Sequence, residues 1–417
     1  MVKTTKTTFF LSFPAKIASN DFHIVTRTTG IMRSSVTSGG TFYIMAGRLK
    51  HISKSTLPLL LSISLLFGTS CRKKTAENAD PFEKITFGEN RTWTNEDPKY
   101  EDLIKTLRVG SIDKSSYKGS YLIANDDAVL FLYCEDAIEI DWKTSVNPYT
   151  TYDIGSTSKT ITAVSVMQII EKGKISLHDT IDKFFPDYQE GKNITVYHLL
   201  HMQSGIPDYL NTPEKFWGFT GEWKQKDDLL SDRITDEEFL SALYAAPLDF
   251  TPGSKMMYCN TNYQLLAMIV EKISGQRFCD YLKENIFDPC GMKHTTSMVQ
   301  GNETAVPLSF KPYYDSGMVD EKGHSKQCIR ERGDGGIHTC VADLLAFDRA
   351  LFGGKLINSD SLAEMMNFDH GYGCGLMPNG NNGCQHGGAA FTYSAENKIT
   401  TLDGGKDHLY VIILEHH

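Results

Sequence analysis

The sequence lacks the patterns of cysteine and histidine that mark redox motifs and metal sites. None of its nine cysteines forms a C-x-x-C pair, and no cluster of cysteine and histidine has the spacing of a zinc site. His198 and His201 lie three residues apart, but the sequence shows no third ligand beside them. We therefore interpret both histidines as packing or polar residues, and we predict neither a metal nor a cofactor. The sequence leaves disulfide pairing open.

A basic stripe is also missing from the main part of the chain. Residues 1–74 carry 11 lysines and arginines against one acidic residue, whereas the remainder carries 31 basic residues against 50 acidic ones. Proteins that bind nucleic acid need clustered basic side chains to neutralise phosphates. The acidic body argues against a nucleic-acid partner, and the chain shows no internal repeats.

The apolar run from Leu57 to Phe67 is too short for a comfortable transmembrane helix. It follows a basic segment that begins at Met45, and it precedes Gly68-Thr69-Ser70-Cys71, which resembles a bacterial lipoprotein signal. We predict translation from Met45, export, and a lipid anchor at Cys71 on the periplasmic or cell-surface side of a bacterial membrane. A plain cleaved signal peptide and a short buried helix stay open as alternatives.

The sequence therefore divides into four segments. We interpret residues 1–44 as disordered or as a misassigned start, 45–70 as a signal peptide, 71–95 as a polar tether, and 96–417 as the functional domain.

Apolar periodicity predicts the elements of this domain. Helices are predicted over 98–108, from Ser156 to Gly173, over 265–275 and over 340–352. Two apolar runs around Asn125-Asp126-Asp127 predict a β-hairpin, and the run 408–414 predicts a late strand. The fold class is α/β, of the α+β type: one antiparallel sheet from N- and C-terminal strands, flanked by helices, with an inserted, mainly helical region.

The first pattern that carries chemistry is Ser156-x-x-Lys159 at the start of a predicted helix. Residues at i and i+3 share a helix face, so the lysine amine can lie beside the serine hydroxyl and act as its base. Ser156 is not in a G-x-S-x-G elbow, which disfavours a conventional Ser-His-Asp α/β-hydrolase. A serine helix cap with a solvated lysine explains the short pattern equally well when it is taken alone.

Two further motifs follow in order, Tyr258-x-Asn260 and His386-Gly387-Gly388. Together with Ser156-x-x-Lys159 they resemble the serine β-lactamase and penicillin-binding protein superfamily. The resemblance is greatest to its branch of class C β-lactamases, D-alanyl-D-alanine carboxypeptidases, and related esterases and D-amino-acid peptidases. It extends from about residue 100 to the end of the chain.

The resemblance implies a role for each motif residue. Ser156 would form an acyl-enzyme, and Lys159 and Tyr258 would share the proton transfers. Asn260 would donate to the acyl carbonyl and hold Lys159. His386 and Gly388 belong to the third motif, and the backbone N–H groups of Ser156 and Ala389 would form the oxyanion hole.

Each residue also has an ordinary structural explanation. Tyr258 could be a half-buried packing residue, Asn260 a helix cap, and His386 a strand residue with its ring in solvent.

The third motif departs from the Lys-Thr-Gly or Lys-Ser-Gly of many relatives. His386 is expected to be charged only part of the time near neutral pH, and Gly387 has no hydroxyl. Both features would weaken recognition of a substrate carboxylate. We therefore favour a hydrolase of esters or amides, including peptides. The alternatives are a D,D-carboxypeptidase or β-lactamase acting on cell-wall peptides or β-lactams, and a non-catalytic surface binding protein on the same fold.

Overall fold

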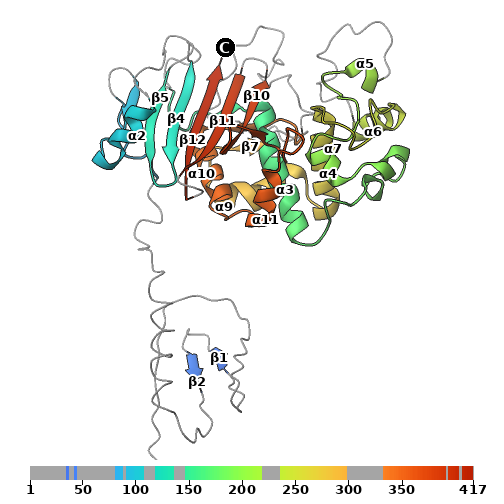
Figure 1. The fold of residues 1–417 in the computed structure, drawn as a ribbon, viewed down its shortest axis with the longest axis horizontal. Helices are drawn as coiled ribbons and strands as arrows, with labels where there is room; N and C mark the ends of the chain where they lie inside the picture. Colours follow the sequence, from blue (N-terminus) through green and yellow to red (C-terminus); the bar gives the residue numbers. More distant parts are fainter. Residues whose placement is uncertain are drawn as a thin grey trace, which may run out of the picture. The chain divides into compact units, whose positions relative to one another are not determined.

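The chain divides into two compact units, Met1–Ala79 and Asp80–His417. The computed structural model (Figure 1) describes residues 34–36, 42–44, 80–87, 91–107, 118–135, 146–217, 235–297, 332–390, 393–402 and 406–416. In the first unit, β1 (Ser34–Val36) and β2 (Phe42–Ile44) pair in antiparallel fashion. The predicted signal peptide and Cys71 lie outside the described residues.

An antiparallel sheet of seven strands is the frame of the second unit. In spatial order, the strands are β3 (Thr92–Thr94), β5 (Val129–Cys134), β4 (Gly119–Asn125), β12 (Asp407–His416), β11 (Tyr393–Leu402), β10 (Gly383–Ala390) and β9 (Met377–Pro378). The late strand β12 pairs with β4 of the early hairpin, with Ile412 opposite Leu122. This confirms the predicted sheet, in which strands from both ends of the domain meet.

The two faces of the sheet enclose two separate cores, because successive side chains of a strand point to opposite faces. Leu122 of β4 lies in the larger core, which contains most of the helices, whereas Ile123 lies in a smaller core with Tyr100 and Ile104. The smaller core is covered by η1 (Pro98–Tyr100) and α2 (Glu101–Thr106), where a helix was predicted.

The remaining helices lie between the early and late strands. They are α3 (Ser158–Glu171), α4 (Val196–Leu200), α5 (Pro213–Phe216), α6 (Asp236–Ala245), α7 (Asn260–Ser274), α8 (Phe278–Leu282), α9 (Asp288–Cys290), α10 (Val341–Phe352) and α11 (Ser359–Met365), with the 3₁₀ turns η3 (Gly155–Thr157), η4 (Ile181–Lys183) and η5 (Gln189–Asn193) and a π-helical turn, η7 (Lys283–Phe287). None of the helices in the described segments has both the length and the apolar character needed to cross a bilayer.

A second, three-stranded sheet stands beside the start of α3. Its order is β6 (Tyr152–Asp153), β8 (Ile337–Thr339) and β7 (Thr296–Ser297), all antiparallel. The turn η3 follows β6 directly and contacts β10 and β11 of the large sheet, while α3 packs against α7. The start of α3 therefore lies where the sheet meets the helical region (Figure 1).

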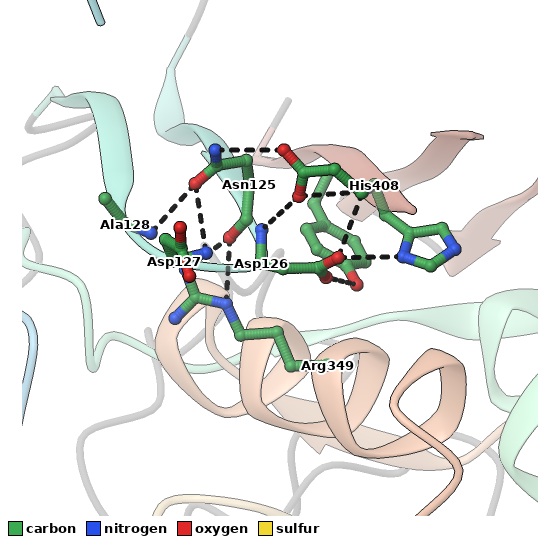
Figure 2. A network of polar contacts seen from close by, with 8 residues as sticks. Asn125, Asp126, Asp127, Ala128, Arg349 and His408 are labelled. Atoms are coloured by element: carbon green, nitrogen blue, oxygen red, sulfur yellow. Dashed lines mark hydrogen bonds and ion pairs between the residues drawn. The ribbon is translucent and has the colours of Figure 1, made fainter. Parts of the chain in front are cut away.

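The turn of the early hairpin is tied to α10 and β12 by polar side chains, which we call the α10 network (Figure 2). Asn125 Oδ1 accepts the backbone N–H groups of residues 127 and 128, which is a typical way for asparagine to close a turn. Arg349 of α10 donates hydrogen bonds to the Asn125 carbonyl oxygen. The Asp126 carboxylate accepts hydrogen bonds from the side chains of His408 and Tyr410 of β12. The network joins the central strands β4 and β12 to α10.

Candidate active site

Ser156 lies in η3, and the chain there must approach β10 very closely. The φ angle of Gly155 is 46°, a conformation that glycine adopts readily, and a Cβ atom at this position would lie 2.8 Å from Ala389 N. A Cβ atom on Gly388 would overlap the Ile154 carbonyl oxygen and lie 3.0 Å from Ser156 N. The two glycines therefore permit the backbones of Ser156 and Ala389 to lie side by side, as the predicted oxyanion hole requires.

Lys159 is fully buried one helical turn after Ser156. Its Nζ atom lies 2.9 Å from Ser156 Oγ, 2.7 Å from Asn260 Oδ1 and 2.6 Å from the Asp334 carbonyl oxygen. Nζ therefore lies within hydrogen-bond distance of three oxygen atoms. The alternative of a solvated lysine beside a helix cap is wrong, because Lys159 has no exposed surface and Ser156 makes no cap.

Tyr258 contributes its ring to the same group of side chains, which we call the Ser156 site. Its centroid lies 4.9 Å from Lys159 Nζ, 6.0 Å from the ring of Tyr372 and 6.3 Å from the ring of His386. The residue is half-buried and precedes α7 by two positions. Tyr258, which is distant along the chain, therefore lies beside Lys159, the residue three positions after Ser156.

Asn260 is the first residue of α7, where Cys259 and not Asn260 occupies the cap position. Its orientation is set by Asp208, a buried carboxylate that accepts the Asn260 backbone N–H at 2.8 Å and its Nδ2 at 3.0 Å. Because Nδ2 donates to Asp208, the carbonyl end of the amide must face Lys159. The predicted hold of Asn260 on Lys159 is present.

Sequence reasoning missed both Asp208 and Asp334 as parts of the site. Asp208 also accepts the backbone N–H groups of Leu210 and Asn211, as an aspartate in a turn commonly does. The sequence signal for this residue was its position in the turn Ser204-Gly205-Ile206-Pro207-Asp208. Asp334 contributes a backbone carbonyl, which no residue type could reveal. Burial raises the pKa of its carboxyl, which accepts the Tyr209 hydroxyl at 2.8 Å.

His386 differs from its expected state. Its ring is buried, and Nδ1 lies 2.7 Å from the Gly387 carbonyl, which can only accept, so Nδ1 carries the hydrogen. Nε2 then accepts the Tyr372 hydroxyl at 2.9 Å. Burial, with a smaller contribution from Lys159, lowers the pKa of His386 to about 3. The expectation of partial charge near neutral pH is therefore wrong, and so is the alternative of a ring in solvent.

Two groups of metal-ligating side chains occur in the described parts of the chain, and neither includes Ser156, Lys159 or Tyr258. They are His201, Glu364 and Cys374, and His294, Cys340 and Asp343. The seven cysteines in these parts are free, which resolves the disulfide question for them. They are Cys134, Cys259, Cys279, Cys290, Cys340, Cys374 and Cys384.

Comparison with known proteins gives one consistent result. The Beta-lactamase family model matches residues 121–401. Penicillin-binding protein 4* of Bacillus subtilis (strain 168) is 28% identical over 262 residues, which are 60% of this chain and 55% of that protein. The chain spans about half the length of the first curated relatives it matches.

Solved structures show the same fold. A D-stereospecific amidohydrolase from Streptomyces sp. has a TM-score of 0.55 and 25% identity, covering 72% of this chain and 89% of that one. The penicillin binding protein from Bacillus halodurans has a TM-score of 0.57 and 20% identity, covering 76% and 95%.

Proposed function

The chain belongs to the Beta-lactamase family, and we propose that it is an exported serine hydrolase that cleaves an ester or amide through an acyl-enzyme on Ser156. The observation that carries the proposal is the 2.9 Å contact between Lys159 Nζ and Ser156 Oγ. A serine hydroxyl beside a buried amine is an activated nucleophile. Residues of all three sequence motifs lie near this contact: Asn260 binds Lys159, and the ring of Tyr258 lies beside that of His386.

In acylation, Ser156 Oγ bonds to the substrate carbonyl carbon, and its proton passes to a neutral Lys159 amine. The ammonium so formed is stabilised by the oxygens of Asn260 and Asp334. The oxyanion develops against the N–H groups of Ser156 and Ala389. Lys159 and Tyr258 then return the proton to the leaving group as its bond to the carbonyl carbon breaks.

In deacylation, water attacks the acyl carbon and loses a proton to the same pair of groups. The bond to Ser156 Oγ breaks, and the proton returns to that oxygen. The acid product leaves, and the free enzyme is restored. No residue of the chain changes its net protonation over the cycle.

The third motif sets the preferred substrate class. His386 is neutral and donates its one ring hydrogen to Gly387 O, and residue 387 has no side chain that could hold an anion. A free carboxylate beside the scissile bond would therefore find no cation from this motif. We propose esters and amides without that carboxylate, such as amino-acid amides, ahead of β-lactams and D-Ala-D-Ala peptides. The amidohydrolase relative supports this order, since its name specifies an amide substrate.

Covalent labelling tests the acyl-enzyme. A fluorophosphonate probe should add one adduct to the intact protein, as measured by mass spectrometry, and Ser156→Ala should remove it. Ser176→Ala is the matched control, because Ser176 is an exposed serine in the turn beyond α3, and this variant should label normally. A folded protein that reacts with no acylating probe would favour the non-catalytic binding protein.

A substrate panel tests the preference. p-Nitrophenyl esters, D- and L-amino-acid amides, nitrocefin and D-Ala-D-Ala peptides are assayed side by side, and kcat/KM should be highest for esters or amides. A higher kcat/KM for nitrocefin or the D-Ala-D-Ala peptide would replace the proposal with its first alternative.

Export and a lipid anchor at Cys71 remain part of the proposal, on the sequence pattern of residues 45–71 alone. Mass spectrometry of the mature N-terminus, after expression of the full chain in a bacterium, should find a diacylglyceryl-modified residue 71. Cys71→Ser should abolish the modification. A mature N-terminus that still carries residue 70 would remove the anchor from the proposal.

A further inference from the structure

Three side chains that play no part in the proposed chemistry lie close together near Tyr372, which contacts His386 of the third motif. His201 directly follows α4, Glu364 lies near the end of α11, and Cys374 lies in the loop between α11 and β9. We propose that His201 Nε2, Glu364 Oε1 and Cys374 Sγ bind a divalent transition metal ion, and that Zn²⁺ fits the site best. This inference is independent of the acyl-enzyme chemistry.

The spacing of the three atoms suits a metal ion. His201 Nε2 lies 3.0 Å from Glu364 Oε1 and 3.3 Å from Cys374 Sγ, and all three atoms lie within 4.8 Å of one another. Zinc bonds to N, O and S of about 2.0–2.3 Å place tetrahedral ligands about 3.3–3.6 Å apart. A small outward shift of the carboxylate would complete this geometry.

The hydrogen bond on the far side of the His201 ring leaves Nε2 available. Nδ1 lies 3.1 Å from the Tyr372 carbonyl oxygen, which only accepts, so Nδ1 carries a hydrogen. In a neutral ring, Nε2 then presents a lone pair to the cluster. Metal-binding histidines are commonly oriented in this way, with the second ring nitrogen donating to a backbone carbonyl. The Tyr197 ring, stacked 4.2 Å from the imidazole, fixes it further.

Burial and donor type favour a metal site with three protein ligands and an open fourth position. His201 is 1% exposed and Cys374 is fully buried, whereas the Glu364 side chain is 28% exposed. A thiolate, an imidazole and a carboxylate together suit zinc, and water can reach the fourth position from the Glu364 side.

The metal would hold the loop that carries Tyr372. The carbonyl of Tyr372 orients His201, and its hydroxyl donates to His386 of the third motif. In the same loop, the Gly375 carbonyl accepts the Thr160 hydroxyl at 2.6 Å, next to Lys159. An ion at this place would connect α4 and α11 to the loop that contacts His386 and Thr160 of the Ser156 site.

The second cluster does not support a similar proposal. Cys340 Sγ accepts the Asp343 backbone N–H as the cap of α10, and Asp343 Oδ2 accepts His294 N and the Thr295 hydroxyl. These bonds within and around a helix end account for the group without an ion.

Cobalt substitution tests the proposal with a readout that does not depend on activity. Metal-free full-length protein is titrated with Co²⁺ under reducing conditions, and a thiolate-to-cobalt charge-transfer band should rise to one equivalent. Cys374→Ser should lose this band, and His201→Gln should lose or weaken it. Cys290→Ser, which changes a cysteine outside both clusters, is the matched control and should keep the band.

Thermal unfolding supplies the second measurement. Added Zn²⁺ should raise the Tm of the metal-free protein by several degrees, because an ion that binds only the folded state stabilises it. Glu364→Gln alters the most exposed ligand and should fold normally, but it should shift the Co²⁺ titration to higher concentration. If the wild-type protein shows neither a band nor a Tm shift, the three side chains form a hydrogen-bonded cluster only, and the proposal is overturned.

Discussion

The Ser156 site and the α10 network each contain a basic side chain that donates to a backbone carbonyl. They differ in the other hydrogen-bond partners of that side chain. Lys159 reaches the Asp334 carbonyl, the Asn260 amide oxygen and, in addition, the Ser156 hydroxyl. Arg349 donates to the Asn125 carbonyl, in a network that ties a hairpin turn to α10 (Figure 2). The difference is the Ser156 hydroxyl, which can lose a proton, whereas the Asn125 carbonyl can only accept hydrogen bonds.

The two regions also treat buried acids differently. At the Ser156 site, Asp208 accepts hydrogen bonds from five N–H donors, which are the backbone N and Nδ2 of Asn260, the backbone N and Nδ2 of Asn211, and the backbone N of Leu210. Beside the α10 network, Asp348 is buried and accepts a hydrogen bond from Asn397 Nδ2 at 3.0 Å. Burial with few donors favours the neutral form of an acid, which is the case at Asp348. Four predictions test this comparison.

The largest effect is expected at Lys159. Lys159→Ala should lower turnover by about 10²–10⁴-fold, because the general base for Ser156 is lost. The rate of hydrolysis of the best substrate in the panel measures this, with circular dichroism as the control for folding. Unchanged turnover would remove Lys159 from the mechanism.

A smaller loss of activity is expected at Asp208, which touches no substrate and acts through Asn260. Asp208→Ala frees the Asn260 amide to rotate, so kcat should fall by up to about 10²-fold, as misplacement of catalytic groups does. KM should change little, and Asp208→Asn should restore part of kcat because its oxygen can still accept one N–H. A rise in KM with an unchanged kcat would contradict this positioning role.

Arg349 should affect stability and not chemistry. Arg349→Met keeps the length of the side chain but removes its hydrogen bonds to the Asn125 carbonyl, at a cost of about 1.5–3 kcal/mol in the free energy of unfolding. Denaturant unfolding measures the loss. The kcat of the folded variant should equal that of the wild type, and a large fall in kcat would mean that the two regions are coupled.

The last prediction is a dependence of stability on pH that Asp348 should produce. Burial raises the pKa of the Asp348 carboxyl to about 8, and the bond from Asn397 offsets this only in part. An unfolded aspartate has a pKa of about 3.9, so the folded state binds the additional proton between these values. The stabilisation is complete below about pH 4 and is lost as the pH rises towards 8.

Asp348→Asn should remove this part of the pH dependence. Thermal unfolding of both proteins across neutral pH should show a Tm that falls less steeply with rising pH in the variant. The same slope in both proteins would assign the dependence to other groups.

Much of the fold could be predicted from local patterns. The turn at Asn125, the helix that starts at Ser156, and the strand that β12 forms all follow from apolar periodicity and turn residues. The meeting of early and late strands in one antiparallel sheet could be predicted as well, whereas the order of the strands came from the structure. The motif residues Ser156, Lys159, Tyr258 and Asn260 could be named as well, because their side chains differ in chemistry from ordinary packing residues.

The rest of the site could not be read from residue types. Lys159 is held by a carbonyl of residue 334, and any residue could supply a carbonyl. His201 was interpreted as a packing or polar residue because Glu364 and Cys374 lie more than 160 positions further along the chain. The charge of His386 was misjudged because its surroundings in the fold, burial first and then the nearby Lys159, lower its pKa.

The order of residues alone determined which groups can act as nucleophile, base and amide partner, and where helices and strands begin, since these depend on side-chain chemistry and on near neighbours. Tertiary structure alone decided which of those groups are dry, which carry charge, and which distant side chains come within bonding distance. The physical reason is that desolvation and hydrogen bonding depend on the surroundings of a side chain in space. Those surroundings exist only in the folded chain.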